Sequence, residues 1–108
     1  MLDPLANVPY PITQAGLAAL QRLVEIAATD TGQSRTVADF LLAWWNARAC
    51  GGFDLTTLWS VAPPLRDDML VVLDLIAHHR EFPTAYGLDD AFTALVARWR
   101  PGVAQAHR

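Results

Sequence analysis

Apolar residues recur at steps of three and four along four stretches of the chain, and a glycine or a proline follows each stretch. This period places the apolar side chains on one face of an α-helix. Glycine and proline are the residues that most often end a helix. The pattern therefore predicts an all-α fold, a compact array of four main helices and one short helical turn.

The glycine and proline residues between these stretches also set the expected helix ends. The four helices are expected from Thr13 to Gly32, from Ser34 or Thr36 to Gly51, from Pro63 to the loop at 81–87, and from 88 to 99. Asp54 is expected to cap the short helical turn that lies between the second and third helices. Residues 1–12 contain three prolines and are expected to form an extended arm, residues 13–101 the single helical domain, and residues 102–108 a frayed tail.

Composition excludes several classes of protein. Hydrophobic residues make up 53% of the 108 residues, which is more than a disordered segment contains. The longest apolar stretch is too short to span a membrane, and the first dozen residues do not resemble a secretory signal. The one cysteine, Cys50, excludes an internal disulfide. These features predict a cytoplasmic protein that does not contact the membrane.

The sequence contains no motif that predicts catalysis. It has no glycine-rich phosphate loop, no paired-histidine metal motif, and no serine or cysteine in a context that indicates a nucleophile. Asp67, Asp74 and His78 share one helix face, but structural metal sites usually need three or four well-placed ligands. A solvated acidic face explains these residues better. We therefore expect no enzyme activity, no metal and no cofactor.

Four tryptophans in a chain of this size suggest a surface that binds another protein. Trp44 and Trp45 are consecutive, and consecutive helical positions point about 100° apart, so both rings cannot face one narrow core. Tryptophan and arginine are enriched at the energetic centres of interfaces. The residues expected to form the partner surface, for a different protein or for a second copy in a homodimer, are Trp44, Trp45, Arg48, Phe53 and Trp59. A wide apolar core face remains the alternative reading of the paired rings.

A second hypothesis is that the chain is a small helical DNA-binding transcriptional regulator. A glycine turn precedes Gln33, Ser34 and Arg35, whose side chains are able to bond phosphates and base edges at the start of a recognition helix. The formal net charge of −3 opposes this interpretation, because binding to phosphate backbones requires clustered cations. Nucleic acid is therefore the less favoured partner.

Three segments carry a family resemblance that spans residues 17–101: VADFLLAWWNA, GGFDLTTLWSV and HHREFPTAYGLDDAFTALVARWRP. The sequence resembles a family of small bacterial proteins of unknown function, often encoded on plasmids and integrative elements, with WWNA and GGFDL as the most specific segments. The resemblance brings no activity or cofactor. It implies an accessory role for mobile DNA, such as an anti-CRISPR-like inhibitor that binds a host defence complex stoichiometrically.

Overall fold

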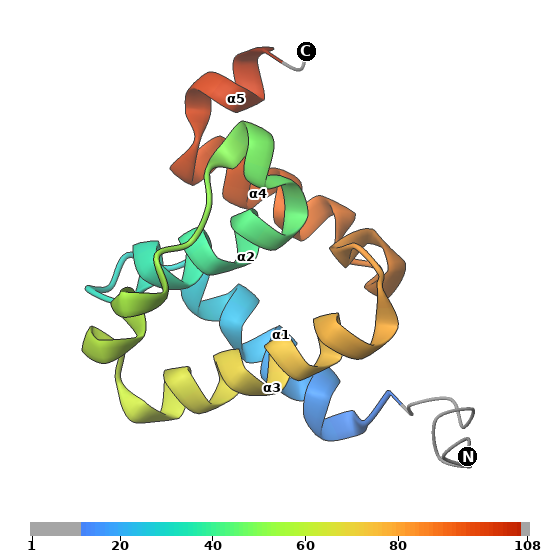
Figure 1. Ribbon diagram of the computed structural model, residues 1–108. Helices are drawn as coiled ribbons and strands as arrows, with labels where there is room; N and C mark the ends of the chain where they lie inside the picture. Colours follow the sequence, from blue (N-terminus) through green and yellow to red (C-terminus); the bar gives the residue numbers. More distant parts are fainter. Residues whose placement is uncertain (1–11, 107–108) are drawn as a thin grey trace.

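The computed structural model describes residues 12–106, and every regular element within that range is a helix (Figure 1). The expected all-α class is thus confirmed. The α-helices are α1 (Gln14–Ala27), α2 (Ser34–Cys50), α3 (Pro63–His79), α4 (Asp89–Trp99) and α5 (Pro101–Ala106), and the 3-10 helices are η2 (Leu55–Ser60) and η3 (Pro83–Tyr86). The sequence predicted the first four α-helices and the turn at η2, but not η3 or α5.

The start of α1 follows the sequence closely, whereas its end does not. Thr13 caps the helix, and its side-chain oxygen accepts a hydrogen bond from the Gly16 amide at 2.9 Å. The helix ends at Ala27, well before the expected stop at Gly32. Beyond this end, the Thr29 amide and hydroxyl both donate to the Ile26 carbonyl, at 3.0 Å and 2.7 Å, where a continuing helix would use the amide of residue 30.

Helix α2 begins at Ser34, which was one of the two starts expected, and it is interrupted near its end. Asn46 has φ −165° and ψ 86°, outside the helical region. The Asn46 side-chain oxygen accepts a hydrogen bond from the Ala49 amide at 3.2 Å, as an N-cap residue does. The last turn of α2 is therefore a separately capped unit with a new direction.

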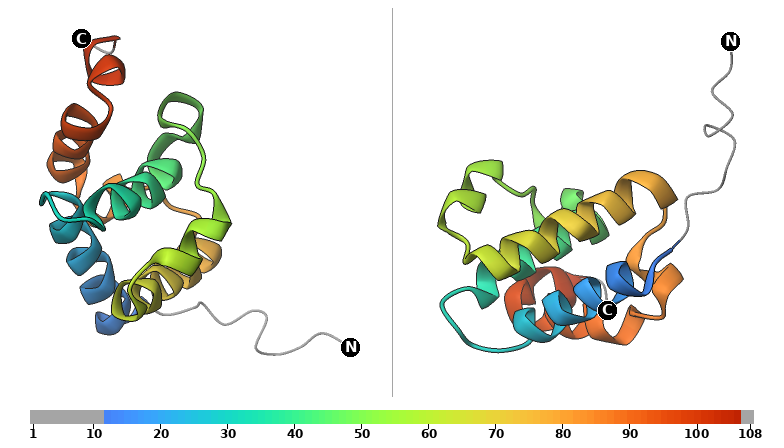
Figure 2. Two further views of the ribbon diagram at one scale, coloured as in Figure 1. Left: turned by 90° about the vertical axis from the view of Figure 1, so that its left-hand side faces the viewer. Right: turned by 90° about the horizontal axis from the view of Figure 1, so that it is seen from below.

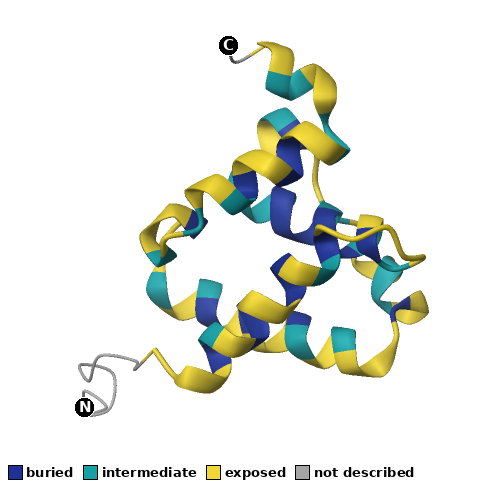
Figure 3. Cartoon of the chain, turned by 180° about the vertical axis from the view of Figure 1, so that it is seen from behind, coloured by how far each residue is buried: buried dark blue, intermediate teal, exposed yellow. Residues whose placement is uncertain are grey.

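The helices pack through the apolar faces that the sequence indicated. Helix α1 contacts α2 and α3, and α2 also contacts α4, so α1 and α2 form the centre of the array (Figures 1 and 2). The faces that point inward are buried and the outward faces are exposed (Figure 3). The largest fully buried apolar side chains come from all four main helices: Leu20, Leu23, Leu41, Leu42, Met69, Phe92 and Leu95.

Three consecutive residues at the end of α4 fasten the carboxyl ends of α1 and α2. Arg98 donates to the Thr29 carbonyl at 3.2 Å, and the Trp99 indole donates to the Ala27 carbonyl at 2.8 Å. Arg100 donates to the Cys50 carbonyl at 2.8 Å. Side-chain donors thus satisfy carbonyls that a helix end leaves without partners.

The ends of the helical domain differ from the sequence expectation in one respect. Pro101 was expected to stop the last helix ahead of a frayed tail at 102–108, but residues 101–106 form helix α5, which packs on α4. Proline is favoured in the first turn of a helix, so Pro101 both ends α4 and starts α5. The arm expected at 1–12 lies, except for Ile12, outside the described residues.

Candidate functional site

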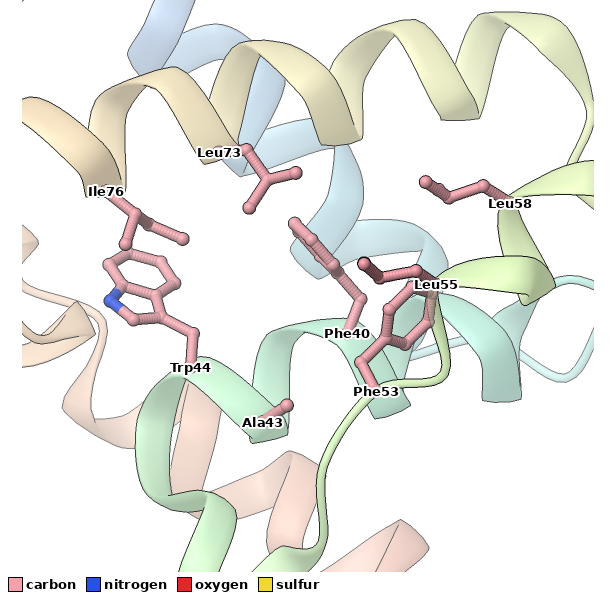
Figure 4. Close-up of a pocket in the computed structure, with 8 residues that line it drawn as sticks. All are labelled: Phe40, Ala43, Trp44, Phe53, Leu55, Leu58, Leu73 and Ile76. Atoms are coloured by element: carbon pink, nitrogen blue, oxygen red, sulfur yellow. The ribbon is translucent and has the colours of Figure 1, made fainter.

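An apolar groove lies between α2, the segment that contains η2, and α3 (Figure 4). Its volume is about 230 Å³. The side chains that line it are Phe40, Ala43, Trp44, Phe53, Leu55, Leu58, Leu73 and Ile76. None of these eight side chains is charged, so the groove suits apolar groups.

The turn after α2 forms one wall of the groove. Gly51 has φ 95°, a conformation that side chains other than glycine rarely adopt. This turn leads the chain back along α2, where the Phe53 ring meets Phe40 edge to face, with ring centroids 5.5 Å apart. The Gly51-Gly52-Phe53 sequence thus explains both the end of α2 and the aromatic wall of the groove.

Asp54 then fixes the position of η2. Its carboxylate accepts hydrogen bonds from the Thr56 amide at 2.9 Å and the Thr56 hydroxyl at 2.8 Å. These bonds stabilise the charged form and hold the pKa of Asp54 below its ordinary value. Leu55 and Leu58, three residues apart on a 3-10 helix, consequently point toward the groove together (Figure 4).

Trp44 closes the other end of the groove, next to Ile76 of α3 (Figure 4). Its indole nitrogen donates to the Glu81 carbonyl at 3.0 Å, and its ring meets Phe92 edge to face at 6.2 Å. The polar atom of the indole is therefore already bonded to the chain. Burial raises the pKa of the adjacent Tyr86, and the Glu81 carboxylate raises it further.

Large apolar side chains are exposed at the mouth of the groove and beside it. Leu55 is 67% exposed and Leu73 37% exposed, although both line the groove. Trp59, which follows the lining residue Leu58, is 86% exposed. Leu70 lies one helical turn before Leu73 and is 50% exposed. Contiguous apolar exposure of this kind marks interaction sites more often than isolated exposed residues do.

The residues that the sequence suggested for a partner surface do not all meet at this groove. Trp44 and Phe53 line it, and Trp59 is exposed next to it. Trp45 is half-buried and packs against the core, whereas Arg48 is exposed on the last turn of α2.

The residues that the sequence suggested leave out the four lining residues that α2 and α3 supply besides Trp44. They are Phe40, Ala43, Leu73 and Ile76. The helical spacing of Phe40, Leu73 and Ile76 indicated core positions. The signal that points to Leu73 and Ile76 is an apolar face on α3 that is wider than its contact with α1 covers.

The three residues proposed for DNA binding have different surroundings. The Ser34 hydroxyl is buried and lies 2.8 Å from the hydroxyls of both Thr29 and Thr31. The Gln33 side-chain oxygen accepts from the Ala62 amide at 2.8 Å. Only Arg35 of the three is exposed. Two of these side chains therefore serve contacts within the fold.

The residues considered for a metal site are spread along α3. The His78 ring nitrogen lies 2.8 Å from the Asp74 carbonyl and 3.4 Å from the Asp74 carboxylate, while Asp67 is within 4.0 Å of Arg66. Across residues 12–106, no three His, Cys, Asp or Glu side chains are grouped so that they could hold a metal ion. Among the helices of the same range, none is long and apolar enough to cross a membrane.

Comparison with known proteins places the chain in a family. Residues 17–100 match the profile of a family of unknown function, DUF7673. Comparisons with curated proteins and with solved structures found no match. The match extends from the first turns of α1 to Arg100, and so contains every residue that lines the groove. The chain therefore belongs to the DUF7673 family of unknown function.

Proposed function

We propose that this chain is a noncatalytic protein-interaction module that binds its partner through the apolar groove and the exposed residues at its mouth. The observation that carries the proposal is the groove itself, a concave site lined by eight uncharged side chains that leaves Leu55 and Leu73 accessible. Burial of apolar surface is the main favourable contribution to protein association.

The chemistry of the groove favours an apolar protein segment as its occupant. The indole nitrogen of Trp44 is the one polar side-chain atom among the lining residues, and it is bonded to the Glu81 carbonyl. A polar ligand would lose its hydrogen bonds to water without replacement, at a cost of about 1–3 kcal/mol for each group. A leucine or aromatic side chain would instead gain about 1.5–3 kcal/mol when fully buried.

The same lining supports a noncatalytic role. Acid–base and nucleophilic catalysis need a titratable or nucleophilic side chain within reach of the bound molecule. The eight lining side chains include neither kind. The module would therefore act by occupying a partner's surface, in a fixed ratio.

An accessory role for plasmids or integrative elements is the cellular setting that we propose. A small cytoplasmic module that acts by stoichiometric binding suits the inhibition of a host defence complex, because such an inhibitor needs affinity but no chemistry. Inhibition of the target would rise linearly with the amount of the module and would reach its maximum at one equivalent. A catalytic inactivator would instead continue to act at lower ratios.

Affinity capture from a bacterial lysate, with and without nuclease, tests the module with two matched variants. Leu73 is 37% exposed at the groove, and Val71 is 40% exposed two positions away, about 200° around α3. We expect Leu73→Asp to abolish a nuclease-resistant, stoichiometric complex and Val71→Asp to retain it. Equal retention by both variants would contradict the proposed surface, and a complex that nuclease removes would favour DNA binding.

A further inference from the structure

Trp59 is the most exposed of the large hydrophobic side chains in the described range, and it lies beside the groove. It follows Leu58, which points into the groove, on the 3-10 helix η2. A 3-10 helix has three residues per turn, so Trp59 lies about 120° around η2 from the face that Leu55 and Leu58 share. The ring therefore does not enter the groove of its own chain, although its residue adjoins one that lines the groove.

The groove has the size and chemistry that an indole ring needs. An apolar cavity of about 150 Å³ is large enough to bind benzene. The cavity here is about 230 Å³, which leaves room for a second fused ring. Trp44, Phe40 and Phe53 offer ring faces and edges to an aromatic occupant.

We infer that the occupant of the groove is a second copy of this chain, and that each copy inserts its Trp59 ring into the groove of the other. This inference rests on the function proposed above. A projecting ring and a cavity of matching size on one surface make that surface self-complementary. A two-fold axis then allows both contacts to form at once and closes the assembly as a dimer.

The exposed apolar surface at and beside the groove is smaller than a standard interface and corresponds to a weak dimer. Trp59 is 86% exposed, and a tryptophan buries roughly 200 Å² when covered, so its ring supplies roughly 170 Å². A standard interface covers about 800 Å² on each partner. Leu55, Leu70 and Leu73 add their exposed surfaces to the same patch. The formal charge of −3 on each copy is small enough to allow association.

The first test is the oligomeric state of the full chain, measured by sedimentation velocity over a concentration series up to a few hundred micromolar. We expect a species of twice the 11.9 kDa chain mass. Trp59→Ser should weaken the dimer by at least about tenfold, as loss of a central tryptophan does. Val71→Ser, at an exposed apolar position away from the groove, should leave the dimer unchanged.

The second test distinguishes reciprocal insertion from any other dimer. Ala43→Phe fills the groove but keeps Trp59, whereas Trp59→Ser keeps an open groove but lacks the ring. Each variant alone should be monomeric under conditions in which the unaltered chain dimerises. An equimolar mixture should form pairs again, because one ring and one open groove then meet. Leu73→Asp is a second variant, which disfavours an apolar ring by placing a charge in the groove, in case Ala43→Phe fails to fold by circular dichroism.

A chain that stays monomeric throughout the series, a dimer that survives Trp59→Ser, or a mixture that does not pair would each overturn the inference. These results leave the proposed function separately testable. If the chain is monomeric and captures a different protein through the groove, the dimer is refuted but the proposed function is not. If the chain dimerises through Trp59, and Leu73→Asp removes no other protein from the affinity capture, then the second copy is the partner.

Discussion

Ser34 shows how a single hydroxyl organises the connection between α1 and α2. Its side-chain oxygen accepts a hydrogen bond from the Thr31 amide at 2.9 Å and contacts the hydroxyls of Thr29 and Thr31, both at 2.8 Å. The residue is fully buried. Buried polar groups are expensive when they lose a partner, so the loop depends on this one oxygen.

Replacement of Ser34 by alanine should therefore destabilise the fold without affecting the surface. We expect Ser34→Ala to lower the free energy of unfolding by about 1–3 kcal/mol, because the Thr31 amide loses its partner and the Thr29 and Thr31 hydroxyls each lose one of two contacts. Arg35→Ala, at the exposed neighbouring position, should change it by less than about 0.5 kcal/mol. Urea unfolding followed by circular dichroism measures both, and equal effects would refute the role assigned to Ser34.

At the scale of elements, the sequence identifies helices better than it identifies their contacts. Periodicity located α1 to α4, and Asp54 correctly indicated the turn at η2. The predicted end of α1 was wrong, since the chain leaves the helix at a turn in which Thr29 bonds the Ile26 carbonyl, and the start of α5 was missed because Pro101 was interpreted only as a stop. Local patterns describe which residues prefer a helix, whereas these ends depend on individual hydrogen bonds.

The groove was only partly predictable for a related reason. Trp44, Phe53 and Trp59 stood out by residue type, but Leu73 and Ile76 follow the spacing of ordinary core residues. Whether such a residue is covered depends on the crossing of α3 over its neighbours. That arrangement is a property of the tertiary packing and is not encoded in the period of one helix.

The cap of η2 should give the chain a measurable response to acid. Because the folded pKa of Asp54 is lowered, its contribution to stability is present above the ordinary carboxyl value of about 3.9 and is lost as the pH falls through the folded value. Asn caps helices about as well as Asp, so Asp54→Asn should keep the fold at neutral pH and show a shallower loss of stability in acid. The thermal unfolding midpoints of the unaltered chain and of Asp54→Asn, measured between about pH 2 and 7, test this prediction. The same dependence of the midpoint on pH in both chains would contradict it.

At the scale of the whole molecule, Arg100 holds the end of α4 against α2. Its guanidinium donates to the Cys50 carbonyl at 2.8 Å, to the Trp99 carbonyl at 2.9 Å and to the Asp39 carboxylate at 2.6 Å. Arginine presents several donors in a fixed planar fork, which lysine does not. One side chain thereby joins the first half of α2, the end of α2 and the junction of α4 with α5.

Arg100→Lys keeps the positive charge, but it should still lower the stability of the fold. We expect a loss of about 2–4 kcal/mol, because a single ammonium group cannot reach the two carbonyls and the carboxylate in the same geometry. Arg66→Lys is a suitable control, since Arg66 is exposed and lies 4.0 Å from its nearest carboxylate, on Asp67. Guanidinium or urea unfolding compares the two, and a change below about 0.5 kcal/mol for Arg100→Lys would refute the assigned role.

The position of the Arg98–Trp99–Arg100 segment has a consequence for the order of biosynthesis. Ribosomes deliver the chain from its amino end, so α1, α2 and α3 leave before the residues that fasten α1 and α2 exist. A nascent chain that stops before Phe92 displays the uncovered apolar face of α2. We therefore expect the domain to close only after α4 has been made, and chains that end earlier to expose an apolar face that chaperones and proteases recognise.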